Sequence, residues 1–562
     1  MTVEQADAKR RKVSVYPNTP RTVSLFSTSA RHPLNVKPGG NLLLALHVDG
    51  VPKHQQLGRM AAWPDELIME FLGYIDDVST IKNLSHTSRV MYAFCYDEEL
   101  WKRLFLKNFA TEPKTWHGSW RSTVLGIPVD KQANLQLPDN LHCSDLLYRP
   151  FQCSQINYEK LFAKIISEEQ KYHSDSINDT LGSLPPGRIP RFKEETMSLD
   201  KFGKTYHDTP FILTNSNASR WPDWNMKSLL DRFSDIKFRQ EAVEWSLSTY
   251  GEYLKHNQDE NPLYLFDCNS TAMKTLTKEY EAPQIFQEDL FTVFNSEAGN
   301  CRPDHAWLIV GPARSGSTFH KDPNYTSAWN AALTGRKLWI MFPPEITPPG
   351  VGTDDEESEV TSPVGIAEWV ISGFFNDSVK IPECQIGVTF PGECMYVPSG
   401  WWHSVINIDD SVALTQNFVP NTKLPNALHF LKNKRDQLSG FHPNEVKKVL
   451  DYILKTSDEK NDDLTILQDY STKFNSLNID GDEDCGEIVC SKLPPMPIFE
   501  LFKQLLIRNG KKQDLDQGLE ALLRIEAKQQ ALLTGKSKKW EALTGNGTAS
   551  AFSFNFEDRD DE

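Results

Sequence analysis

The spacing of hydrophobic residues changes several times along the chain and divides it into segments. Residues 1–57 are mostly polar, and beyond them apolar residues recur at the three- and four-residue spacing of helices. They later fall into short runs typical of strands, and then return to helical spacing. The pattern predicts an α+β protein. The predicted segments are a disordered basic arm (1–57), a helical domain (58–110), a connecting region (111–220), a β-rich domain (221–423), a helical region (424–534) and a disordered acidic tail (535–562).

The first helical segment opens with a start signal. Pro64 suits the first helical position, and Asp65 and Glu66 suit the positive end of a helix. Asp76 and Asp77 separate this helix from further short ones. The apolar positions that predict these helices are Trp63, Leu67, Ile68, Phe71, Leu72, Ile75, Val78, Ile81, Leu84, Val90, Met91, Phe94, Leu100, Trp101, Leu104 and Phe105.

Short apolar runs separated by turn residues predict a β-barrel or sandwich in the middle of the chain. The candidate strands are Tyr264–Phe266, Ala306–Val310, Ser317–Asp322, Lys337–Phe342, Val388–Phe390, Cys394–Val397, His403–Ile408 and Val412–Phe418. Between Pro343 and Pro382 lies an acidic insertion, which predicts a solvated loop, with a lid that attracts a basic substrate as the alternative. Further helices are predicted at 157–170, 424–438, 443–456, 496–508 and 513–534.

The strand predicted near residue 320 contains His320-Lys321-Asp322. Alternation along a strand places His320 and Asp322 on one face and Lys321 on the other. A catalytic metal needs a third ligand, and the best candidate is His403, 81 residues beyond Asp322. Two His and one carboxylate form the facial triad of non-haem Fe(II) oxygenases, which leaves coordination positions open. The H-x-D alone is weak evidence, because such pairs also arise by chance in surface loops.

A second feature strengthens the prediction that these three residues bind a catalytic metal. Lys337, in GRKLWIMF, lies inside an otherwise apolar strand, and a buried Lys is costly unless it meets an anion. The dicarboxylate 2-oxoglutarate, which chelates iron at one end, would supply that anion at the other. Trp329, Trp339 and Trp402 are candidates for apolar walls around the site, although each also suits an ordinary core.

Composition limits the class of protein. A chain of 562 residues with 39% hydrophobic and 24% charged residues predicts two to four globular domains. The net charge of −16 argues against binding nucleic acid and favours cationic partners such as Lys/Arg-rich peptides. Nine scattered cysteines without a signal peptide indicate a reducing compartment, and no apolar run is long enough to span a membrane. We therefore expect a soluble nuclear or cytoplasmic protein.

Three short motifs in the polar segments carry weaker hypotheses. Lys9-Arg10-Arg11-Lys12 resembles a nuclear import signal, but a solvated tail is an equal explanation. Cys485 and Cys490 are interpreted as free thiols. The acidic run from Asp480 to Glu487 fails the EF-hand pattern, so no calcium site is predicted there.

The motifs GPARSGSTFHKDPNYTSAWNAALTGRKLWIMFPP and PGECMYVPSGWWHSVINIDDSVALTQNF resemble the Jumonji-C (JmjC) family of Fe(II)/2-oxoglutarate oxygenases. The resemblance covers about Trp221 to Lys423 and is strongest to the branch of nuclear lysyl hydroxylases and arginine demethylases once described as phosphatidylserine receptors. It implies a double-stranded β-helix, the cupin-type jelly roll, with Fe(II), 2-oxoglutarate and O2 as cofactor and cosubstrates. The implied iron ligands are His320, Asp322 and His403; the implied 2-oxoglutarate contacts are Ser317 (Thr in that branch), Asn330, Lys337, Thr415 and Tyr264.

The helical segment WPDELIMEFLGYIDDVSTIKNLSHTSRVMYAFCYDEELWKRLF resembles an F-box along its length. The resemblance implies that residues 60–109 bind the Skp-type adaptor of cullin–RING ubiquitin ligases. The alternative is a helical subdomain that only packs on the oxygenase. The resemblance to the JmjC branch also implies that helices after the core can mediate a homodimer.

Three functions follow from these patterns. The first is a dioxygenase that hydroxylates or demethylates protein Lys or Arg side chains and is coupled through an F-box to a ubiquitin ligase. The second is a catalytically silent F-box receptor that recognises a protein for ubiquitination. The third is a metal-binding cupin of unrelated chemistry, such as an isomerase. The complete triad with Lys337 and Thr415 favours the first, because loss of catalysis usually erodes ligands, and the third leaves Lys337 unexplained.

Overall fold

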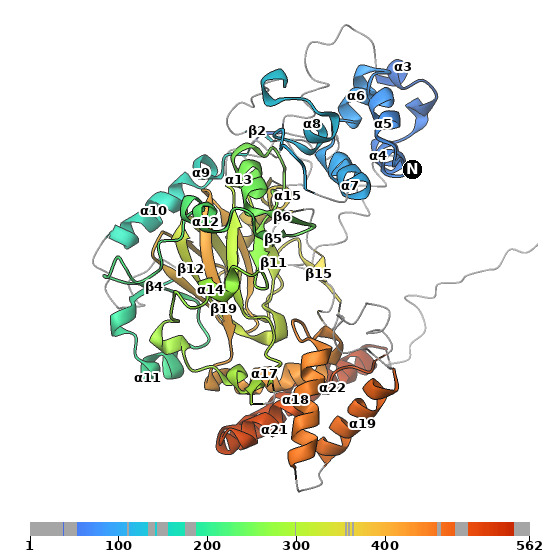
Figure 1. The fold of residues 1–562 in the computed structure, drawn as a ribbon. Helices are drawn as coiled ribbons and strands as arrows, with labels where there is room; N and C mark the ends of the chain where they lie inside the picture. Colours follow the sequence, from blue (N-terminus) through green and yellow to red (C-terminus); the bar gives the residue numbers. More distant parts are fainter. Residues whose placement is uncertain are drawn as a thin grey trace, which may run out of the picture.

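The computed structural model describes most of the chain between residues 53 and 544. The described residues are 37–38, 53–109, 112–132, 141–142, 156–174, 187–297, 299–354, 357, 360–361, 365–371, 373–457, 462–477 and 493–544. N-terminal helices, a central β-structure and C-terminal helices follow one another through the molecule (Figure 1). The basic cluster at Lys9, the Cys485 and Cys490 pair, the run from Asp480 to Glu487 and the end of the predicted tail lie outside the described residues.

Two facing β-sheets form the centre of the molecule (Figure 1). The larger has nine strands in the order β3-β4-β17-β12-β19-β10-β7-β5-β6, and the smaller has four, β11-β18-β13-β16. Within these sheets only β3 and β4 pair in parallel. The strands are β3 (Arg191–Lys193), β4 (Phe211–Thr214), β5 (Lys237–Gln240), β6 (Val243–Ser246), β7 (Leu265–Asp267), β10 (Ala306–Gly311), β11 (Gly316–His320), β12 (Ser327–Thr334), β13 (Lys337–Phe342), β16 (Gln385–Thr389), β17 (Cys394–Val397), β18 (Trp402–Asn407) and β19 (Ser411–Phe418). This arrangement confirms the predicted α+β class and the cupin-type jelly-roll core.

Two local predictions about the strands were wrong. The sequence SAWNAALT was not predicted as a strand, yet it forms β12 between β17 and β19, because its small alanines fit a fully covered sheet while giving little β signal. The strand predicted to run through Asp322 ends at His320. Pro323 begins a 3-10 turn directly after Asp322, and proline cannot donate to a strand ladder.

The N-terminal helices share their core with the larger sheet. They are α3 (Lys53–Leu57), α4 (Asp65–Gly73), α5 (Val78–Ser85), α6 (Arg89–Phe94), α7 (Glu98–Asn108) and α8 (Trp120–Leu125). Helix α4 begins at Asp65, so Pro64 is the N-cap residue and not, as predicted, the first residue of the helix. The ring of Phe105 on α7 lies 5.3 Å from the ring of Trp120 and 6.1 Å from that of Trp245 on β6. One continuous apolar core therefore fixes these helices to the β-structure.

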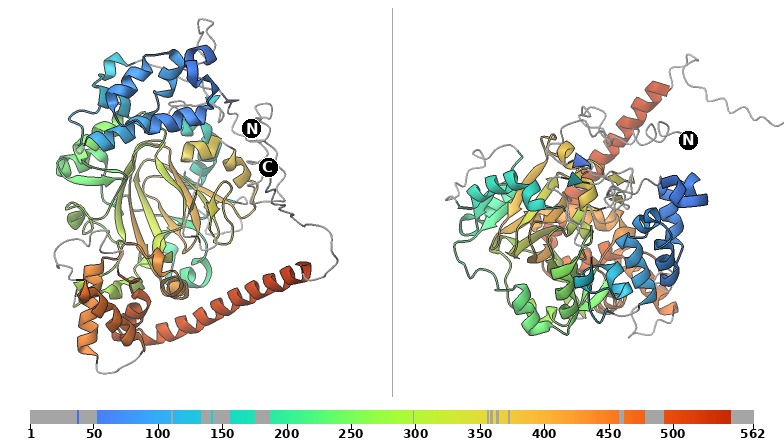
Figure 2. Two further views of the ribbon diagram at one scale, coloured as in Figure 1. Left: turned by 90° about the vertical axis from the view of Figure 1, so that its right-hand side faces the viewer. Right: turned by 90° about the horizontal axis from the view of Figure 1, so that it is seen from above.

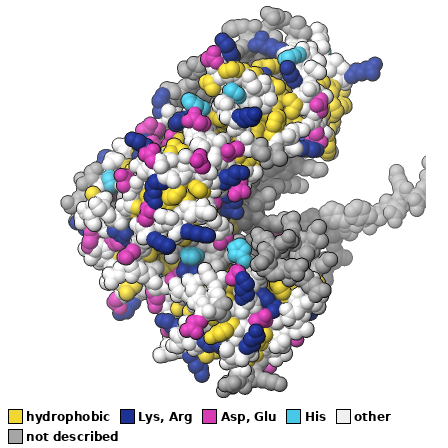
Figure 3. Space-filling view, in the orientation of Figure 1, with side chains coloured by type: hydrophobic (Ala, Val, Ile, Leu, Met, Phe, Trp, Pro, Cys, Tyr) yellow, Lys and Arg dark blue, Asp and Glu magenta, His cyan; other side chains and the backbone are white. Residues whose placement is uncertain are grey.

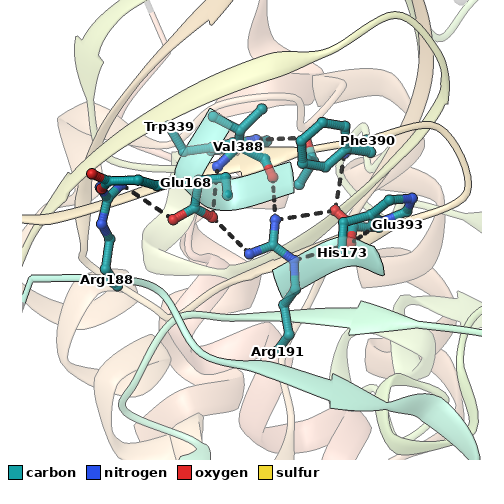
Figure 4. Close-up of polar contacts among 10 residues, drawn as sticks. Glu168, His173, Arg188, Arg191, Trp339, Val388, Phe390 and Glu393 are labelled. Carbon is teal, nitrogen blue, oxygen red and sulfur yellow. Dashed lines mark hydrogen bonds and ion pairs between the residues drawn. The ribbon is translucent and has the colours of Figure 1, made fainter. Parts of the chain in front are cut away.

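Buried ion pairs attach helix α10 (Ala163–Ser174) to the outside of the β-structure (Figure 4). Arg191 of β3 donates to Glu169 at 2.6 Å and to Glu393, before β17, at 3.0 Å. Arg188 donates to the second oxygen of Glu169 at 3.2 Å, and His173 Nδ1 lies 2.9 Å from Glu393. Burial raises the pKa of Glu393, but Arg191 and the hydrogen bonds outweigh it and hold that pKa below its usual value.

The second half of the acidic insertion is structured, which contradicts the predicted solvated loop. It forms α15 (Ile366–Ile371) and α16 (Phe374–Ser378), whose residues Trp369 and Phe375 are buried against the smaller sheet. These apolar residues explain the packing. Toward the acidic half, Glu357 accepts a hydrogen bond from Lys321 at 2.6 Å.

Among the described residues of the C-terminal region, five helices surround a separate apolar core. They are α17 (Leu424–Asn433), α18 (Pro443–Thr456), α19 (Asp462–Ser476), α21 (Ile498–Arg508) and α22 (Lys512–Thr544). Helix α19 was not predicted, and α22 continues to Thr544, beyond the predicted end at residue 534. The last part of α22 projects away from the other helices (Figure 2). Within the described residues, no helix has the length and apolar character needed to cross a membrane.

Candidate metal and cosubstrate site

The three predicted metal ligands converge at one end of the facing sheets. His320 ends β11 and lies directly opposite His403 of β18, with the two ring centroids 4.2 Å apart. Asp322 follows two residues after His320. One ligand atom from each of the three side chains lies within 4.8 Å of the others. This spacing suits a single transition-metal ion with two His and one carboxylate ligand.

Backbone contacts orient both imidazoles. His320 Nδ1 lies 2.8 Å from the carbonyl oxygen of Thr318, and His403 Nδ1 lies 3.1 Å from that of Trp401. A carbonyl oxygen only accepts, so each Nδ1 donates its proton and each Nε2 keeps a lone pair. Metal-binding histidines are usually held in this way.

The hydrogen bonding and protonation of Asp322 and His403 also suit a bound cation. Asp322 Oδ2 is buried without a hydrogen-bond partner among the described residues. Burial raises the pKa of Asp322 to about 6, although His320 and Asn417 oppose the rise. Burial, with the nearby charge of His320, holds the pKa of His403 well below its usual value, so its ring is neutral. A neutral imidazole and a carboxylate with one oxygen left without a hydrogen bond among the described residues suit a divalent metal.

The triad opens into a cavity of about 530 Å³. All eight residues predicted for metal and cosubstrate line it, and Lys321, as predicted, faces away, with its ammonium 4.6 Å from the ring of Trp402. The eight are Tyr264, Ser317, His320, Asp322, Asn330, Lys337, His403 and Thr415. Residues far apart in the sequence thus share one cavity.

Lys337 lies at the opposite end of β13 and β18 from the triad. It pairs in register with Asn407, whereas His403 pairs with Met341. The Lys337 ammonium donates to the Tyr264 hydroxyl and to Asn407 Oδ1, each at 2.9 Å. Both acceptors are neutral, and burial lowers the pKa of Lys337 to about 7. A buried amine with a third donor and only neutral partners is a ready site for a carboxylate.

Thr415 and Asn330, two further predicted contacts, pair in register on β19 and β12 of the larger sheet and line the cavity. Thr415 Oγ1 donates to the carbonyl oxygen of Trp329 at 2.7 Å, and Asn330 Oδ1 is buried without a partner among the described residues. Of the three tryptophans considered as walls, only Trp339 lines the cavity. Trp329 stacks on Trp221 at 5.7 Å and Trp402 belongs to the core beneath α15, so neither shields the site.

The sequence reasoning missed several polar residues in and around the cavity. Asn417 lines it two residues after Thr415, and Ser315 lines it before β11. Asn407 contacts Lys337 and donates to Ser315 Oγ at 2.8 Å. The period of two along strands contained the signal, because His403 and Asn407 lie four residues apart and therefore share one face of β18.

Comparison with known proteins agrees with this geometry. A model of the cupin-like domain matches residues 179–424, and one of the F-box-like domain matches residues 61–107. The chain is 34% identical over 422 residues to arginine-specific demethylase JMJ22 of Arabidopsis thaliana, covering 72% of this chain and 77% of the relative.

Two further relatives are shorter matches. The bifunctional arginine demethylase and lysyl-hydroxylase psr-1 of Caenorhabditis briggsae is 35% identical over 276 residues, covering 45% of this chain and 67% of the relative. The 2-oxoglutarate and iron-dependent oxygenase JMJD4 of Mus musculus is 27% identical over 212 residues, covering 35% of this chain and 45% of the relative.

Proposed function

The chain belongs to the JmjC group of cupin-like oxygenases, which depend on Fe(II) and 2-oxoglutarate, and from this premise we propose that it oxidises lysine or arginine side chains of a protein. The relatives are named for arginine demethylation and lysyl hydroxylation. The observation that carries the proposal is the meeting of the His320, Asp322 and His403 ligand atoms in the cavity that also contains the Lys337 amine.

In this proposal each side chain has a defined task. His320, Asp322 and His403 hold Fe(II), and Lys337 binds the distal carboxylate of 2-oxoglutarate while Tyr264 and Asn407 position its ammonium. When bound, iron and 2-oxoglutarate supply the oxidation, in which O2 converts a substrate C–H to C–OH with succinate and CO2 as co-products.

The cavity wall limits access of water. Buried apolar side chains separate the polar residues: Trp339, Val397 and Val405 line the cavity together with Ile309. A dry site strengthens the attraction between Lys337 and the carboxylate and protects the reacting centre from side reactions. In this proposal the polar side chains orient the reactants, and the apolar ones cover part of the reacting centre.

The F-box-like helices support a second part of the proposal, that this domain binds a Skp-type adaptor. Several large apolar side chains of α4, α7 and the adjoining residues are exposed, and on the face shown in Figure 3 hydrophobic side chains gather over these helices. The exposed residues are Trp63, Leu67, Tyr74, Leu106 and Phe109. Exposed apolar patches of this kind often mark protein interfaces.

The enzyme test compares two histidine variants. With Fe(II) and a protein or peptide substrate, the wild-type chain should convert 2-oxoglutarate to succinate, whereas His320→Ala should lose turnover by at least about a hundredfold. His429→Ala, which changes a histidine of α17 that is half-buried like His320 but does not line the cavity, is the matched control and should retain activity. Full turnover by His320→Ala would remove the proposed ligand set. Mass spectrometry of the peptides then separates gain of one oxygen from loss of a methyl group.

A further inference from the structure

The cavity extends beyond the residues proposed for iron and 2-oxoglutarate. Its wall also contains Glu241, Phe266 and Trp307, which have no task in the function proposed above. They come from neighbouring parts of the larger sheet: Glu241 from the turn between β5 and β6, Phe266 from β7, and Trp307 from β10. A volume of about 530 Å³ is ample for a five-carbon dicarboxylate and leaves room for a substrate side chain.

The two aromatic residues form a stacked pair. The ring centroids of Phe266 and Trp307 lie 4.5 Å apart at an interplanar angle of 28°, and both side chains are half-buried. Aromatic faces attract cations, and tryptophan does so most strongly. The chain itself shows this attraction, since the guanidinium of Arg239 lies 5.8 Å from the Trp307 ring.

Glu241 adds a carboxylate to the same wall. Among the described residues that line the cavity, it is the one acid besides Asp322. Its φ of 49° lies in the left-handed region, which costs a residue other than glycine of order 1 kcal/mol. The Tyr264 backbone N–H donates to its carboxylate. The two-residue turn between β5 and β6 accounts for this backbone conformation and fixes Glu241 at the cavity wall.

Glu241 is exposed to solvent at the edge of the cavity, and the groups around it shift its pKa in both directions. Desolvation raises its pKa, Lys102 of α7 and the Tyr264 N–H lower it, and Glu99 and Asp259 raise it further, so that the pKa lies above its usual value. A cation that enters the cavity would lower this pKa.

From these contacts we infer that Glu241, Phe266 and Trp307 form a substrate subsite for a cationic head group, either guanidinium or ammonium. The subsite rests on the proposed function and extends it by naming the residues that select the substrate. The Glu241 carboxylate pairs with the positive charge of the head group. The rings of Phe266 and Trp307 contact its flat face and the adjoining methylene or methyl groups. A neutral side chain of the same length lacks both attractions and is bound more weakly.

The test uses three pools of fluorescent peptides with random flanks and a fixed central arginine, lysine or norleucine. Succinate release gives KM at saturating 2-oxoglutarate, and fluorescence polarisation gives Kd. The variants are Glu241→Gln, Glu241→Gly and, as a matched control, Glu244→Gln, an exposed acid on the adjoining strand β6. Glycine suits the left-handed backbone at 241, so Glu241→Gly removes the carboxylate without endangering the fold.

Both Glu241 variants should raise KM and Kd for the arginine or lysine pool about tenfold, with the norleucine pool and the peptide-independent turnover of 2-oxoglutarate unchanged. Glu244→Gln should match the wild-type protein. An unaltered preference for the cationic pools in both Glu241 variants overturns the subsite while the proposed function stands. If the wild-type protein shows no preference for the cationic pools, the proposed substrate class fails and the subsite fails with it.

Discussion

Lys337 and Asn407 face each other on neighbouring strands, and the Lys337 ammonium donates to Asn407 Oδ1 at 2.9 Å. Neither residue has any exposed surface. The Asn407 amide nitrogen donates to Ser315 Oγ at 2.8 Å, which fixes the amide with its oxygen toward Lys337. A neutral acceptor positions the ammonium without cancelling its charge. The charge therefore stays available for the carboxylate of 2-oxoglutarate.

Substitutions of Asn407 test this arrangement. Asn407→Leu removes the acceptor and should raise KM for 2-oxoglutarate about tenfold while kcat changes less. Asn407→Asp keeps an acceptor but adds an anion that competes with the cosubstrate, and should raise KM further. Steady-state kinetics, with thermal unfolding to check folding, measure both effects. Equal KM values for 2-oxoglutarate in folded wild-type and Asn407→Asp proteins would contradict the role of Asn407 as a neutral acceptor for Lys337.

The pH dependence of 2-oxoglutarate binding follows from the pKa of Lys337. Burial lowers that pKa to about 7 in the free protein, and a bound carboxylate raises it. Binding therefore takes up a proton when the pH lies between the two values. Affinity should be greatest below pH 7 and fall by up to tenfold per pH unit above it. Titration calorimetry, or KM values determined between pH 6 and 9, measure this fall in affinity. The Lys337→Arg variant, whose charge does not titrate in this range, should show no such fall.

The ion pairs around Arg191 should dominate the stability of the connecting region. Glu393→Gln removes a buried charge partner and should lower the free energy of unfolding by about 3 kcal/mol at pH 7. Because the pKa of Glu393 lies below its usual value, this contribution is present at neutral pH and is lost as the pH falls through that lowered pKa. Urea unfolding at several pH values checks both statements. Glu168→Gln, whose side chain is 39% exposed, should cost less than about 1 kcal/mol.

Point substitutions test the proposed adaptor surface better than a deletion does. Deleting residues 60–109 would strip Phe105 from Trp120 and Trp245, so loss of binding could reflect a damaged core. Leu67→Asp and Tyr74→Asp, at 42% and 76% exposure, should abolish co-purification with a Skp-type adaptor and leave 2-oxoglutarate turnover intact. Val129→Asp, at 50% exposure beyond α8, should retain binding. Binding that survives both substitutions would place the adaptor contact elsewhere.

Strong local patterns made much of the fold predictable from the sequence. The apolar runs of β13 and β19 and the helical spacing of α18 are visible without any tertiary information, because burial on both faces of a strand or on one face of a helix dictates them. The prediction failed in segments whose sequence has little preference for either helix or strand. The alanines of β12 and the end of α22 show no such signal, and the structure decided both.

For the site, the sequence alone supplied the residue types: two histidines and a carboxylate suited to iron, and a lysine too costly to bury without an anion. Only the tertiary structure decided their meeting, since His320 and His403 are neighbours through the pairing of β11 with β18 and not through the chain. It also decided that Asn407 accepts from Lys337, and that Glu241, Phe266 and Trp307 share the cavity. The physical reason is that these contacts depend on strand register and sheet closure, which join residues too distant in sequence for local spacing to relate.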